Sequence, residues 1–142
     1  MADAKKLARI HRVRTLQLNL TRADEMRAQE KHASETMLAG RIQALADAVA
    51  PAAATTFGGA SLGAQAHFRE RLHQSAAAAQ ARVSMAEQFA AQAAEATRSA
   101  KRDQSAVEKL LERARREALV REMRALEETP PTGRQGIRHD PC

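Results

Sequence analysis

The sequence has almost no aromatic residues, with no Trp, no Tyr and three Phe among 142 residues. A β-sandwich or an α/β enzyme needs more aromatic and β-branched bulk for its core. Such folds also need more turns than six Gly and four Pro provide. All-β and thick-cored folds are therefore excluded.

Cysteine is also scarce, because Cys142 is the only one in the chain. No intramolecular disulfide and no Cys-based metal cluster can form. His67 and His73 do not share a helical face, so we expect no metal site and no cofactor. No apolar run is long enough to cross a membrane, and Met1 to Lys6 do not resemble a secretory signal. We therefore expect a cytosolic protein without catalytic activity.

What remains is rich in Ala, Glu, Arg, Leu and Gln, a composition typical of long helices and coiled coils. We predict an all-α fold in which two long helices form an antiparallel coiled-coil hairpin, the second overhanging the first. Residues 1–129 form this domain, with helices over 4–49 and 62–128 and a loop over 50–61. Asp3 and Ser61 are candidate helix caps, and residues 130–142 are predicted to be a disordered tail.

The second helix carries the strongest pattern, a row of residues at alternating steps of four and three. Such a row is typical of a coiled-coil seam, and a seam this rich in Ala lets a partner helix approach closely. Two polar members, Thr97 and Gln104, are candidates for fixing the register. The row consists of Leu72, Ala76, Ala79, Val83, Ala86, Ala90, Ala93, Thr97, Ala100, Gln104, Val107, Leu111, Ala114 and Ala118.

The first helix offers two stripes of large residues that differ in phase, so we expect no strict heptad there. If the loop brings Val49 near Leu62, Leu20 meets the region of Ala90, and large residues pack against small ones. That pairing leaves residues 105–128 without a helix opposite them, as a surface for partners. The stripes are Leu7, Ile10, Val13, Leu16 and Leu20, then Leu38, Ile42, Leu45 and Val49.

The net charge of +6 is concentrated near the two ends of the helical region. Residues 1–22 carry six Lys or Arg and one Asp, and residues 98–124 carry nine Lys or Arg and five acids. Nucleic acid is a poor match, because no aromatic side chains accompany these cations for base stacking. A protein partner of opposite charge is favoured.

Four segments together resemble the FliJ family of flagellar export proteins, which are related to the stalk proteins of type III secretion. The segments are Lys5-Lys6-Leu7-Ala8-Arg9-Ile10, the Gly-bearing loop, Phe68-Arg69-Glu70-Arg71-Leu72 and Val107-Glu108-Lys109-Leu110-Leu111-Glu112-Arg113. The resemblance implies a two-helix coiled coil similar to the central stalk of rotary ATPases. It also implies a cytoplasmic location, peripherally associated with the inner membrane, and no direct membrane insertion.

Two binding surfaces are implied by this resemblance, together with export chaperones as further partners. The open end would enter the export ATPase ring through Lys5, Lys6, Arg9, Arg12, Arg14, Lys109, Leu110, Arg113, Arg116, Leu119, Arg121 and Met123. The membrane export-gate protein would contact Leu38, Ile42, Leu45, Val49, Phe68, Leu72, Ser75 and Ala79. The family has aromatics in the helix-1 part of this strip, where this chain has aliphatic residues.

A second reading places the protein outside flagellar export. A cytosolic coiled-coil adaptor or chaperone of another system would hold its partners along the same Ala-rich shaft. The residues of the shaft do not distinguish these readings, whereas the identity of the bound partner does.

Overall fold

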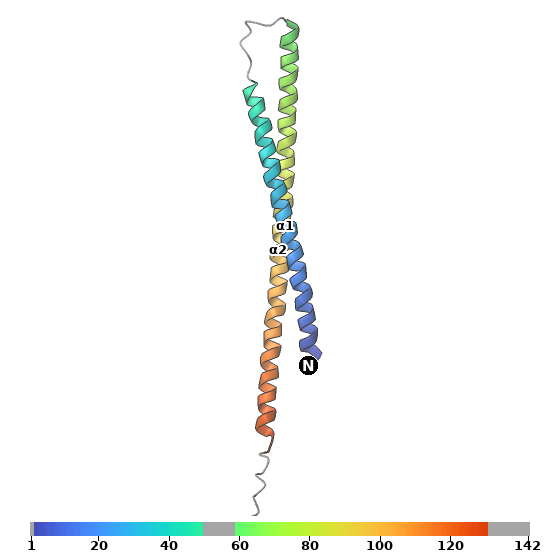
Figure 1. Ribbon diagram of the computed structural model, residues 1–142, viewed down its shortest axis with the longest axis vertical. Coiled ribbons are helices and arrows are strands. Elements are labelled where there is room, and N and C mark those ends of the chain that lie inside the picture. The colour runs from blue at the N-terminus through green and yellow to red at the C-terminus, as the bar shows by residue number, and fades with distance from the viewer. Residues whose placement is uncertain (1, 50–58, 131–142) are drawn as a thin grey trace, which may run out of the picture.

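The computed structural model describes residues 2–49 and 59–130. Two helices, α1 (Ala2–Ala48) and α2 (Gly59–Glu128), run antiparallel and cross once along a narrow rod (Figure 1). The predicted all-α hairpin with an overhanging second helix is therefore confirmed. The predicted disordered tail and most of the predicted loop lie outside the described residues.

The helix ends follow from local chemistry. Asp3 lies inside the first turn of α1, which begins at Ala2, and so does not precede that helix as a cap. Its carboxylate instead interacts favourably with the positive end of the helix dipole. Ser61 lies inside α2, which begins at Gly59, and so does not precede that helix as a cap. At the other end of α2, the Thr129 hydroxyl donates a 2.7 Å hydrogen bond to the Ala125 carbonyl. Pro130 follows directly, and its ring excludes a further helical turn.

The α2 seam is the one that the sequence predicts. All fourteen residues of the predicted row are buried or half-buried. Ala79 is 1% exposed and Leu111 is 8% exposed, and the small Ala side chains let α1 lie close to α2.

The α1 seam differs from the prediction, because it keeps a strict heptad that includes six polar residues. Leu18 is 4% exposed at its centre, while Leu16 and Leu20 are 63% and 65% exposed on other faces. The expectation that the large stripe packs against α2 is therefore wrong for most of its members. The buried or half-buried row is Ala4, Leu7, His11, Arg14, Leu18, Thr21, Glu25, Ala28, His32, Glu35, Ala39, Ile42, Ala46 and Val49.

Polar seam residues on α1 are accommodated because α2 presents small residues and hydrogen-bond partners. His11 Nε2 lies 3.4 Å from Gln104 Nε2, so the predicted polar seam residue Gln104 contacts α1. Thr97 instead donates a hydrogen bond to the Ala93 carbonyl of its own helix. Among the described residues, no buried side-chain nitrogen or oxygen lacks a hydrogen-bond partner.

Two ion pairs between the helices define the register. Arg14 pairs with Asp103, and Glu35 pairs with Arg82, each at 3.2 Å. In both pairs the residue numbers add to 117, whereas pairing Val49 with Leu62 gives 111. The expected register was therefore about six residues out.

The corrected register shortens the overhang. It places Leu7 opposite Leu111, and Asp3 and Ala4 line a hollow together with Ala114, Ala118 and Arg121. The packed seam therefore ends at Ala118, and the overhang begins there and not at residue 105. Residues 119–128 are all exposed and extend for roughly 15 Å beyond the start of α1.

Candidate partner-binding surfaces

The two basic segments, far apart in sequence, meet at one end of the rod. The antiparallel hairpin brings the start of α1 beside the last third of α2, and α2 continues past it (Figure 1). We call this region the open end. Its predicted cations Lys5, Lys6, Arg9, Arg12, Lys109, Arg113 and Arg116 are all exposed.

Two predicted cations of the open end already have acidic neighbours within the chain. Arg14 is half-buried and donates to Asp103 at 3.2 Å and to Gln17 at 3.1 Å, so it joins the helices. Arg121 pairs with Glu117 at 3.6 Å, although both side chains stay largely exposed. An exposed pair of this kind contributes little to stability and exchanges partners easily.

Exposed apolar side chains accompany these cations. Leu110, Leu119 and Met123, all predicted for the site, are exposed, and Val120 and Leu126 are exposed beside them. Residues 119–128 lie beyond the last seam residue, Ala118, and among them Arg121 lines a hollow with Asp3 and Ala4 of α1. Only the part of this segment past Arg121 presents its whole circumference. The open end therefore combines positive charge with apolar anchors, as protein-binding surfaces often do.

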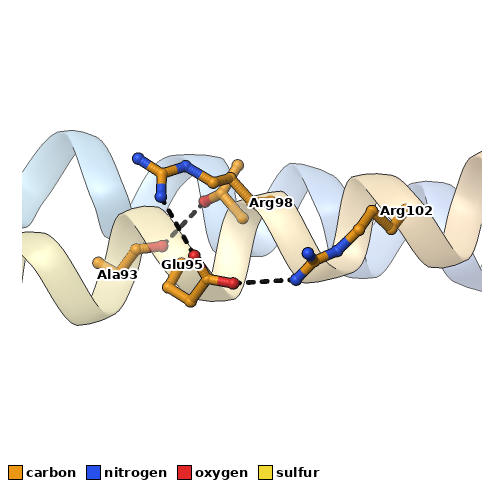
Figure 2. A network of polar contacts seen from close by, with 5 residues as sticks. Ala93, Glu95, Arg98 and Arg102 are labelled. Carbon is orange, nitrogen blue, oxygen red and sulfur yellow. Dashed lines mark hydrogen bonds and ion pairs between the residues drawn. The ribbon is translucent and has the colours of Figure 1, made fainter.

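A basic groove on α2 extends this surface and was not singled out from the sequence. Arg98, Lys101, Arg102 and Lys109 surround a floor made by Ser105 and Ala106. Figure 2 shows Glu95 accepting hydrogen bonds from Arg98 at 3.2 Å and from Arg102 at 2.9 Å. The signal available in the sequence was the spacing of these cations, which places all of them on one helical face away from α1.

The strip predicted for the gate protein is divided by the hairpin into two groups. Ile42, Leu72 and Ala79 lie in the seams, where they hold the helices together, and Val49 is half-buried just after α1. The remaining four, Leu38, Leu45, Phe68 and Ser75, are exposed, and their heptad positions place them along one edge of the rod. We call these four the loop-proximal edge.

The described ranges carry neither a metal-binding cluster nor a membrane-spanning helix. They contain no group of three His, Cys, Asp or Glu residues that could hold a metal ion. Neither α1 nor α2 contains a stretch apolar and long enough to span a bilayer. The surface features that these ranges offer to partners are grooves, edges and charged patches on a two-helix rod.

No protein-family model, curated protein or solved structure matches this chain. The resemblance to FliJ therefore stays a prediction.

Proposed function

We propose that this chain is a non-enzymatic stalk and coupling protein of the flagellar type III export apparatus. It links the export ATPase ring to the membrane export gate, acts at the cytoplasmic face of the inner membrane and supports flagellum assembly. The observation that carries the proposal is the open end, where exposed cations of both helices meet beside a projecting single helix.

The shape of the rod suits insertion into a ring. Two packed helices are about 20 Å across, and the overhang narrows this to the width of one helix. Lys5 and Lys6 lie near the positive end of the α1 dipole, where they oppose it and do not stabilise the helix. A negatively charged partner explains their position better than helix stability does.

The chemistry of the open end suits a mobile contact. Exposed cations speed the encounter with an acidic surface, and the attraction between them is screened by salt. Leu119 and Met123 supply apolar area for the remaining affinity. The shaft and the loop-proximal edge then remain available for binding export chaperones and the gate protein.

Charge reversal with a matched control tests the proposal. Arg9→Glu combined with Arg116→Glu should reduce stimulation of the export ATPase at least about tenfold, because each reversal replaces attraction with repulsion. Arg41→Glu combined with Arg71→Glu changes the net charge equally at the other end and should leave stimulation intact. Stimulation by the wild type should also fall as salt is raised.

Equal stimulation by the two reversed proteins would count against ring docking. A pull-down from cells then separates this function from that of an adaptor in another system. Recovery of the export ATPase supports the stalk, whereas recovery of other proteins alone supports the adaptor.

A further inference from the structure

The outer face of α1 carries a second heptad row, opposite the seam. Because α1 follows a strict heptad against α2, its opposite side repeats with the same period and forms a continuous stripe. Ala23 is half-exposed, and all other members are exposed. The row consists of Val13, Leu16, Leu20, Ala23, Arg27, Glu30, Ser34, Met37, Arg41, Ala44 and Ala48.

A hollow in this face has the geometry of a coiled-coil hole. It is lined by Glu30, Ala33, Ser34, Met37, Leu38 and Arg41, all of α1. The first four are spaced at three, four and seven residues. Four residues so spaced form the hole that receives one side chain of a facing helix. The apolar end of the row supplies such side chains at Leu16 and Leu20.

We propose that this face binds the same face of a second copy of the chain, running antiparallel. The two-fold axis passes at the level between Ala28 and Gln29, so that Leu20 of one copy reaches the hollow beside Met37 of the other. Ala23 then faces Ser34, which lets the helices approach closely. The proposal goes beyond the stalk function, since it concerns a face on the other side of α1 from α2.

The charges of the outer face select this arrangement. With the axis at that level, Arg27 of each copy lies opposite Glu30 of the other. The charged centre of the row therefore forms two pairs of opposite charge. Asp24 likewise faces Lys31 along one edge, and Arg12 faces Asp47 along the other. A parallel pair would instead set like charges against each other in register.

Within one hairpin, Arg27 pairs with Asp24 at 2.8 Å, and both side chains are largely exposed. Exchanging this pair for contacts with the second copy therefore costs little. Arg41 is the one charge that meets an apolar residue, Leu16, and its methylene stem can cover that side chain while its head stays in water.

Apolar side chains on either side of the outer row favour the same register of the two copies. Ile10 of one copy comes beside Leu45 of the other, and both are exposed in the single hairpin. Met26 comes beside Ala33 on the opposite edge. An isologous interface needs every contact to be made twice, and this face satisfies that condition over most of the length of α1.

Sedimentation equilibrium over a range of concentrations tests for the dimer, with Cys142→Ser as background to exclude disulfides. The wild-type face should give a concentration-dependent mass rising from 15.5 kDa toward twice that value. Leu20→Lys should raise the dissociation constant at least about tenfold. Met85→Lys, an equally apolar and exposed site on α2, should not.

Orientation and register are tested by charge and by cross-linking. Arg27→Glu should weaken the dimer about tenfold, and adding Glu30→Arg should restore it. Proteins carrying Ile10→Cys and Leu45→Cys should form disulfide-linked dimers when mixed and not separately. A mass that stays monomeric, a dimer unaffected by Leu20→Lys with unchanged helix content, or cross-links within each protein alone would overturn the proposal.

Discussion

Glu35 and Arg82 form an ion pair across the hairpin, with 3.2 Å between Oε2 and Nε. The pair lies three heptads along the rod from Arg14 and Asp103, and the positive charge is on opposite helices in the two cases. A slide of one heptad would break both pairs at once. An Ala-rich seam specifies register weakly, so these charges supply what the apolar contacts do not.

Reversing one charge of this pair should destabilise the hairpin. Glu35→Arg sets two cations against each other and should lower the free energy of unfolding by about 1 kcal/mol. Combining it with Arg82→Glu should recover most of the loss. Urea denaturation followed by circular dichroism measures both, and equal stability of the wild type and the single variant would show that the pair is unimportant.

Two leucines on α1 distinguish its packed face from its exposed one. Leu18→Ala should lower the free energy of unfolding by about 2–3 kcal/mol, because Leu18 is buried against α2. Leu16→Ala should change it by less than about 0.5 kcal/mol, because Leu16 is 63% exposed. Thermal unfolding at low protein concentration, where the hairpin is alone, gives the comparison. Equal losses would contradict the seam described for α1.

Close approach of the helices depends on small residues in the α2 seam. Ala79→Leu should destabilise the hairpin by about 1–3 kcal/mol, since Ala79 is 1% exposed opposite Ala39 and has no room for a larger side chain. Ala78→Leu, one position along and exposed, is the control and should be nearly neutral. The urea midpoints of the two variants give the comparison. A stabilising Ala79→Leu would show that the interface has room for a larger side chain.

The α2 seam was predictable because apolar residues fill twelve of its fourteen predicted positions. The α1 seam was not predictable, because large apolar residues are spread around that helix and most of them face away from α2. Arg14, Glu25 and Glu35 are tolerated in the α1 seam because small residues on α2 leave room for their methylene stems. Periodicity alone favours the large residues, and the polar seam becomes visible only with both helices in place.

The register between α1 and α2 also could not be predicted by counting residues through the loop. Pairing Val49 with Leu62 assumes that the helices meet directly at the loop, whereas the ion pairs shift the pairing by about two helical turns. As a result Val107 and Leu111, expected on the overhang, lie in the seam. Lys5, Lys6 and Arg9 are exposed because none of them occupies a seam position, whereas Arg14 does.

The loop-proximal edge offers a test of gate binding with an internal control. Phe68→Ala should weaken binding to the export-gate protein about tenfold and leave ATPase stimulation intact, because Phe68 is 54% exposed and far from the open end. Phe89→Ala removes an equally exposed ring three heptads away on the same edge and should preserve gate binding. Isothermal titration with the soluble part of the gate protein measures both. Loss of both activities in Phe68→Ala, with helix content unchanged, would contradict two separate surfaces.

Photo-cross-linking from the overhang tests the stalk proposal most directly. A photoreactive amino acid in place of Met123 lies on the part of α2 that projects past α1, and one in place of Met85 lies on the shaft. With the assembled export ATPase, we expect an adduct from position 123 and none from position 85. An adduct from position 85 alone, or none from either, would contradict insertion of the open end into the ring.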